Sequence, residues 1–120
     1  MISLTSNALK VRLVLEAMDM RKSFNGLSGA IRSIHEGEPN PTYVYVFGNK
    51  RRNRIKILYY DRSGVWVAAK RLEQGTYSWP SGRDKEEAWM PLTPEALQLL
   101  LDGVDLRGAQ LREWYRDPNA

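Results

Sequence analysis

Five cations occupy seven consecutive positions in the stretch GNKRRNRIKILYYD, residues 48–61. They are Lys50, Arg51, Arg52, Arg54 and Lys56. Because like charges repel at this spacing, a folded chain tolerates such a cluster best when an anionic partner neutralises it. Cations beside aromatic side chains are suited to neutralising phosphates and stacking on nucleobases. The residue types therefore favour nucleic-acid binding at this segment.

The positive charge of the chain is concentrated around this stretch. Residues 48–72 contain eight Lys and Arg residues against one acid, Asp61, whereas the whole 120-residue chain has a formal net charge of only +4. Lys70 and Arg71 extend the cluster along the chain. Since the strands of an antiparallel hairpin run side by side, we expect this pair to return near Arg54.

Arg21 and Lys22 form a second candidate contact for an anionic partner. They lie in the first turn of a helix expected over residues 20–35, where free N–H groups and the helix dipole attract phosphate. A purely structural interpretation stays open for both sites. A charged hairpin discourages edge-to-edge aggregation, and Arg21 would serve stability alone if it paired with an acid elsewhere.

Catalytic and metal chemistry has little support in the sequence. The chain contains no cysteine and a single histidine, His35, so thiolate nucleophiles and Cys-based metal sites are excluded. No P-loop, GxGxxG or GxSxG motif occurs, and the acids are scattered rather than clustered as two-metal catalysis requires. We therefore predict no enzymatic activity, no catalytic residues, no metal site and no cofactor.

The hydrophobic periodicity predicts the elements that position these cations. Residues 11–17 alternate weakly, as in a first strand, and Asp19 is a favourable N-cap for the helix at 20–35. One apolar stripe along this helix is expected to be buried against a sheet. It consists of Met20, Phe24, Leu27, Ile31 and Ile34.

From Thr42 onward the period of the hydrophobic pattern changes to two. Short connections between the resulting segments predict antiparallel neighbours. Thr93 and Pro94 have the residue types that start a second helix, and Gly103 is the type that ends one. The expected strands are TYVYVFGN, RIKILYYD, GVWVAAKRL and TYSWP, with a further short one around EEAWMPL.

These elements predict a single α+β domain over residues 1–106. In it, an antiparallel β-meander of about four to six strands packs against one N-terminal helix, and a short C-terminal helix follows. Residues 107–120 are expected to form a C-terminal tail, either a docking arm or frayed. No apolar run approaches the ~20 residues of a membrane span, and the absence of cysteine fits a reducing compartment, so we expect a cytoplasmic protein without a membrane partner.

Four words of the sequence, in this order, resemble a known protein family. They are DMRKSFNGL (19–27), FGNKRRNRIKILYYD (47–61), KRLEQGTYSWP (70–80) and LLLDGVDL (99–106). Over about residues 11–106 the chain is similar to the accessory TnpB protein of bacterial insertion-sequence-66-type transposons, the Orf-two-like family. In that family, a small protein encoded beside a separate transposase assists transposition and is not itself known as the strand-transferring enzyme.

The departures from the family pattern are confined to a few positions. Asn53 stands where the family often has an acid, which raises the local positive charge, and Ala68-Ala69 replaces a bulkier aromatic pair. The candidate contacts themselves follow the pattern at most positions. Those that match are Arg21, Lys22, Arg51, Arg52, Arg54, Lys56, Lys70 and Arg71.

The resemblance implies a non-catalytic accessory protein for DNA transposition. The expected partners are DNA at the transposon ends and the element-encoded transposase. The expected location is the bacterial cytoplasm, and the nucleoid when DNA is bound. A homo-oligomer is compatible with this role. A module that binds only the transposase, without direct DNA contact, stays as the alternative. RNA binding is less favoured because no RNP-like or KH-like motif occurs. The expected nucleic-acid contacts are Lys50, Arg51, Arg52, Arg54, Lys56, Lys70, Arg71, Arg21 and Lys22.

Overall fold

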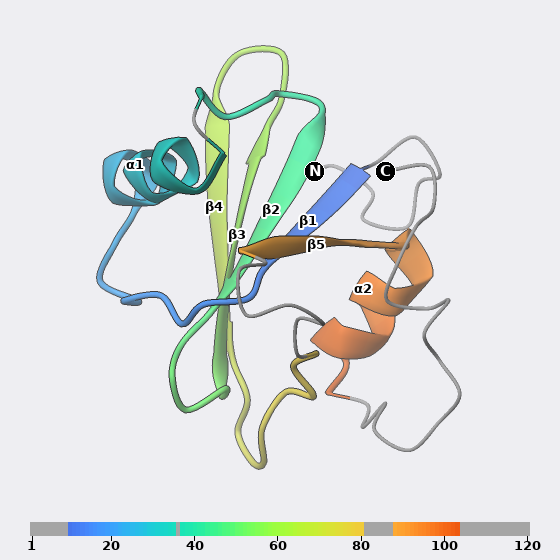
Figure 1. Cartoon of the computed structure of the whole chain (residues 1–120). Helices are drawn as coiled ribbons and strands as arrows, with labels where there is room; N and C mark the ends of the chain where they lie inside the picture. The colour runs from blue at the N-terminus through green and yellow to red at the C-terminus, as the bar shows by residue number, and fades with distance from the viewer. Residues whose placement is uncertain (1–9, 36, 81–87, 104–120) are drawn as a thin grey trace.

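A five-stranded sheet forms the centre of the fold (Figure 1). The computed structural model describes residues 10–35, 37–80 and 88–103. The strand order across the sheet is β4-β3-β2-β1-β5. Along the chain the elements are β1 (Lys10–Val14), α1 (Phe24–His35), β2 (Tyr43–Gly48), β3 (Arg54–Tyr60), β4 (Val65–Arg71), β5 (Trp89–Leu92) and α2 (Pro94–Leu101).

The sheet is mixed, so the α+β class is confirmed but the purely antiparallel meander is wrong. β2, β3 and β4 pair antiparallel as expected, whereas β1 pairs parallel with β2 and antiparallel with β5. Parallel neighbours need a crossover connection, and α1 supplies it. The helix therefore links β1 to β2 instead of preceding the whole sheet. The weak alternation of residues 11–17 indicates a strand but does not specify its neighbours.

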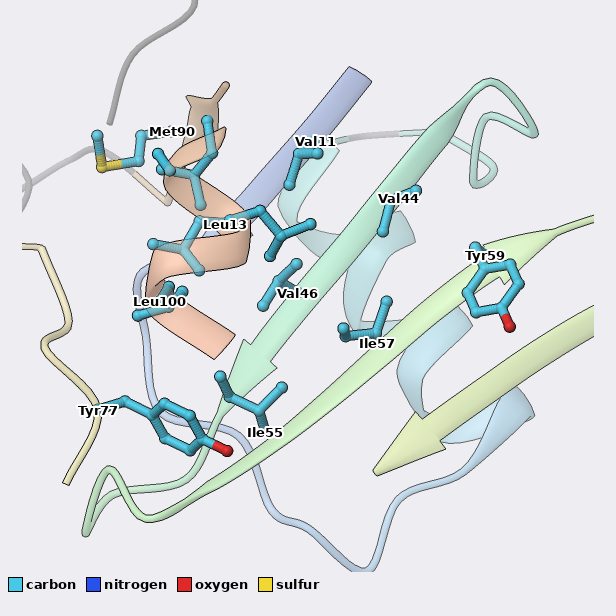
Figure 2. Packing of buried hydrophobic residues seen from close by; sticks show 13 residues of the cluster. Val11, Leu13, Val44, Val46, Ile55, Ile57, Tyr59, Tyr77, Met90 and Leu100 are labelled. Atoms are coloured by element: carbon cyan, nitrogen blue, oxygen red, sulfur yellow. The ribbon is translucent and has the colours of Figure 1, made fainter. Parts of the chain in front are cut away.

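Two apolar clusters cover the two faces of the sheet. On one face, Leu27 and Ile31 of α1 pack in a cluster with Leu58 of β3. On the other face, Leu100 of α2 belongs to a cluster with Ile55 of β3, and Figure 2 shows the side chains of that cluster between the helix and the strands. Because side chains alternate along a strand, even-numbered residues of β3 face α1 and odd-numbered ones face α2.

α1 begins at Phe24 rather than at about residue 20, so the expected N-cap is wrong. The Asp19 carboxylate accepts a hydrogen bond from the Arg21 backbone N–H at 2.9 Å and binds the Arg21 guanidinium at 2.7 Å. The Asp19 carbonyl also accepts from the Lys22 N–H at 3.1 Å. A local turn thus uses the Asp19 oxygens that an N-cap would offer to the helix. Met20 also lies before the helix, and it is half-buried against the cluster that contains Leu27 and Ile31.

The expected burial of Phe24 is also wrong. The residue has an exposed fraction of 46%, whereas Leu27 and Ile31 are fully buried. Phe24 opens the first turn of α1 and lines a cleft with Val65 and Val67 of β4, the strand at one edge of the sheet. The apolar stripe of the helix therefore reaches past the sheet at this end.

Residues 76–80, expected as a strand, form no strand. They are nevertheless fixed by two long-range hydrogen bonds. The Tyr77 N–H donates to the Arg52 carbonyl at 2.6 Å, and the Trp79 indole N–H donates to the Val14 carbonyl at 3.3 Å. Tyr77 is buried in the α2 cluster. The aromatic pattern of this segment thus reflects anchoring by side chains and not pairing in a ladder.

The C-terminal elements follow the sequence closely. The strand expected around EEAWMPL is β5. Thr93 caps α2 by accepting from the Ala96 N–H at 3.1 Å, Pro94 is the first helical residue, and Gly103 adopts a φ of +76° just beyond the end. Such a positive φ is readily adopted only by glycine, which is why the helix stops there. The predicted tail at 107–120 lies outside the described residues.

The described helices are too short or too polar to cross a membrane.

Candidate nucleic-acid interface

The turn between β2 and β3 is organised by one amide side chain. The Asn49 Oδ1 atom accepts hydrogen bonds from the N–H groups of Asn53 and Arg54, both at 3.0 Å. Its Nδ2 atom donates to Asn53 Oδ1 at 2.7 Å. These bonds close the turn and leave Lys50 and Arg51 exposed at its tip. The sequence pair Gly48-Asn49 is a typical turn signal, and the turn it predicts between these strands is confirmed.

β3 and β4 bring further cations to the same end of the sheet. Arg54 and Lys56 lie on the face opposite Ile55, as predicted. Arg54 is the cross-strand partner of Arg71, so the expected return of the β4 end beside Arg54 is confirmed. Like charges directly opposite each other destabilise an antiparallel pair. The repulsion between Arg54 and Arg71 therefore lowers the stability of the fold. An anionic ligand bound beside the two arginines would reduce this repulsion.

A hydrogen bond connects this end of the sheet with the segment before α1. Lys56 Nζ donates to the Lys22 carbonyl at 2.7 Å. The two candidate contacts that were separate in the sequence are therefore neighbours. The second contact differs from the expectation in its position. Arg21 and Lys22 precede α1 and do not lie in its first turn.

Two adjoining hollows run over these cations, and they share Met20 and Arg54. The larger, about 460 Å³, is also lined by Lys56 and Arg71 together with one acid, Glu73. The smaller, about 350 Å³, includes Lys50, Arg51 and Asp19 in its lining. The cations of this region are named here the basic surface. It consists of five residues that line the hollows, Lys50, Arg51, Arg54, Lys56 and Arg71, and of Lys22, whose carbonyl binds Lys56.

Among the described residues, few of these charges have an acidic partner. Arg21 pairs with Asp19, and this hydrogen-bonded pair lowers the pKa of the Asp19 carboxyl to about 2. In the described part of the chain, no ion pair forms to Arg51, Arg54 or Arg71. The structural interpretation therefore fits Arg21, which has its own acid. For the basic surface, a solvated and charged hairpin stays as the alternative to an anionic partner.

Arg52 is directed into the protein, unlike its neighbour Arg51. Its Nη2 atom donates to the Leu15 carbonyl at 3.0 Å, and its guanidinium carbon lies 4.7 Å from the centre of the Trp79 ring. Burial lowers the pKa of this guanidinium. Gly48 permits the arrangement, because a Cβ at that position would lie 2.7 Å from the Trp79 ring. Arg52 thus ties the hairpin to β1 and is not part of the basic surface.

We expect alanine substitutions at these neighbouring arginines to separate their roles. Arg52→Ala removes a hydrogen bond and a cation–π contact, so it should lower the free energy of unfolding by about 1–3 kcal/mol. Arg51→Ala alters an exposed turn residue and should change it by less than about 0.5 kcal/mol. Urea unfolding measures both values. Equal losses at the two positions would contradict the inward assignment of Arg52.

Lys70 is placed on the opposite face from Arg71. Its Nζ atom donates to the Leu101 carbonyl at 2.7 Å, at the C-terminal end of α2. A cation is favourable there because the helix dipole is negative at that end. Lys70 also lines the larger hollow together with Arg71. The predicted pair therefore borders the same hollow, but the Lys70 ammonium is bonded to α2 whereas Arg71 belongs to the basic surface.

Comparison with known proteins places the chain in a family. The model of the family described as "IS66 Orf2 like protein" matches residues 9–111. The uncharacterized protein y4jC of Sinorhizobium fredii (strain NBRC 101917 / NGR234) is 30% identical over 100 residues, which cover 83% of each chain. The uncharacterized protein y4hO of the same strain is 29% identical over 92 residues, 77% of each chain. No solved structure matches the chain. The chain therefore belongs to the IS66 Orf2-like family.

Proposed function

We propose that the protein is a non-catalytic accessory protein of IS66-type transposition that binds DNA at the transposon ends through the basic surface. Membership of the IS66 Orf2-like family supports the role in transposition. The transposase would meet this protein on the same DNA.

One observation carries the proposal. Cations of the β2–β3 turn and of the β3–β4 pair converge on two adjoining hollows. The turn before α1 adjoins them, because Lys56 Nζ donates to the Lys22 carbonyl. The Arg54–Arg71 pair is held cross-strand although the two charges repel. A row of phosphates satisfies such an arrangement, because each phosphate neutralises a cation and binding releases counterions from the DNA. Arg21 contributes less because Asp19 already neutralises it.

We expect binding to duplex DNA to weaken steeply with salt. If the basic surface contacts about five phosphates, log K should fall against log salt with a slope of about −4 to −5. Fluorescence anisotropy with labelled element-end DNA, scrambled duplex of equal length and RNA measures the slope and the preference. Tighter binding to element ends than to scrambled duplex would show that the protein reads the ends.

The transposase-only alternative gives a different result in the same assay. A module without direct DNA contact would bind all three nucleic acids equally weakly, with a shallow slope, while still binding purified transposase. That outcome would refute the proposed DNA contact but keep the role in transposition.

A further inference from the structure

The two edges of the sheet are protected to different degrees. β5, at one edge, has only four residues and includes Pro91, which lacks a backbone donor and so discourages pairing. β4 lies at the other edge (Figure 1). It has seven residues and no proline. Its residues from Val65 to Ala69 are all apolar, and Trp66 has an exposed fraction of 51%. A long apolar edge of this kind is a template for another strand.

The hydrogen bonds at the ends of the β3–β4 hairpin determine which groups of β4 point outward. The Asp61 N–H donates to the Gly64 carbonyl at 3.0 Å, and the Leu72 N–H donates to the Asn53 carbonyl at 2.9 Å. In an antiparallel ladder every second residue pair carries the hydrogen bonds, so the even-numbered residues of β4 bond to β3. The N–H and C=O groups left pointing outward belong to Val65, Val67, Ala69 and Arg71.

We propose that two copies of the chain pair antiparallel along β4, with the two-fold axis at Ala68, and so join their sheets into one. The outward-pointing residues are symmetric about Ala68, so this register matches every one of them with a partner residue. Ala68 then faces itself in a pair without hydrogen bonds, where the Cα atoms come within about 4.5 Å. A small side chain suits that close approach.

Charge complementarity favours a second copy over an unrelated strand. In this register Val65 faces the partner's Arg71, and Trp66 faces the partner's Lys70. Beside Val65 and Trp66 lies a cleft of about 390 Å³, which Phe24 and Asp61 also line. The Asp61 carboxylate accepts from the Trp66 indole at 2.6 Å, and this bond lowers its pKa.

The basic end of each strand would thus meet an apolar cleft with an ionised acid on the other copy. A parallel arrangement would place Arg71 against the partner's Arg71, and the like charges would oppose it. The same contact gives the exposed Phe24 ring a neighbour, since it lies beside the part of β4 that the partner's Arg71 would approach.

Engineered cysteines test the register, and the chain has no native cysteine to interfere. Ala68→Cys should form an intermolecular disulfide under oxidised glutathione, because its partner Cα lies within bridging distance in the proposed pair. Ala69→Cys is the matched control. Its two copies would lie more than about 7 Å apart on the other face, beyond the reach of a disulfide. Equal cross-linking of the two variants on a non-reducing gel would overturn the register.

Sedimentation velocity tests the dimer itself. The full chain should sediment as a dimer at about 100 µM, where even weak interfaces are populated. Ala69→Pro removes an outward N–H without taking a bond from β3, so it should give a folded monomer, with folding checked by circular dichroism. A native chain that stays monomeric at this concentration would overturn the proposal, and an unrelated protein would then be the occupant to seek.

The dimer has one consequence that rests on the proposed DNA binding. Antiparallel pairing at an edge puts the same face of both sheets on one side, so the two basic surfaces face the same way. The two Arg71 residues would be about 20 Å apart along the strands. The cross-linking and sedimentation assays contain no DNA, so they test the dimer independently of DNA binding. A failure of the dimer is therefore distinguishable from a failure of the proposed DNA binding.

Discussion

Replacing Arg51, Arg54 and Arg71 together by alanine is expected to lower the affinity for duplex DNA about a hundredfold at ~150 mM salt. Each cation that neutralises one phosphate contributes about 0.9 to the salt slope, so the slope should become shallower by about 2.7. The fold should survive because these side chains are exposed, and the change removes the repulsion between Arg54 and Arg71. Anisotropy titrations across a salt series measure both quantities.

A charge-matched control separates a local contact from the loss of overall charge. Lys10→Ala, Arg32→Ala and Arg62→Ala together remove the same charge from other places. Arg62 is in the turn at the far end of the β3–β4 hairpin, Lys10 pairs with Tyr43 at the start of β2, and Arg32 is on α1 beside Glu38. We expect this variant to keep most of the affinity. If both triple variants lose affinity equally, DNA binding depends on overall charge and not on the basic surface.

The second large effect concerns the packing of α1 on the strand that carries Arg54 and Lys56. Leu58→Ala should lower the free energy of unfolding by about 2–5 kcal/mol, since Leu58 is fully buried between α1 and the sheet. That loss is a large fraction of the stability of a typical small domain, about 5–15 kcal/mol. Urea unfolding followed by tryptophan fluorescence measures it.

Leu99→Ala provides the control for this substitution. Leu99 lies on α2, is only partly buried and belongs to neither apolar cluster. Its replacement should cost less than about 1 kcal/mol, because alanine also favours the helix. A loss at Leu58 no greater than that at Leu99 would show that α1 does not pack on β3 as described.

Local signals in the sequence were enough to predict several elements. The alternation of apolar residues predicted β2, β3 and β4, and it placed Arg54 and Lys56 on the face opposite Ile55. The cap of α2 was predictable because Thr93 bonds to a residue only three positions away. These features depend on neighbours in the chain, so the chain alone specifies them.

The helix at residues 20–35 shows where local signals compete. Asp19 has the side chain of an N-cap, yet it binds Arg21 in a turn of its own, and the helix starts at Phe24. Either arrangement satisfies the carboxylate. Which of them forms depends on how the segment packs beside β3, where Lys56 holds the Lys22 carbonyl.

Only the tertiary structure decided the place of β1 and the roles of the cations. A strand pattern does not name its neighbours, and β1 was found between β2 and β5. Arg51 and Arg52 are identical residues in adjacent positions, yet one is exposed and the other bonds to Leu15 and lies over Trp79. Those two contacts are distant in the sequence. The sequence by itself therefore determined where positive charge accumulates, and packing between distant segments decided which of those charges face solvent.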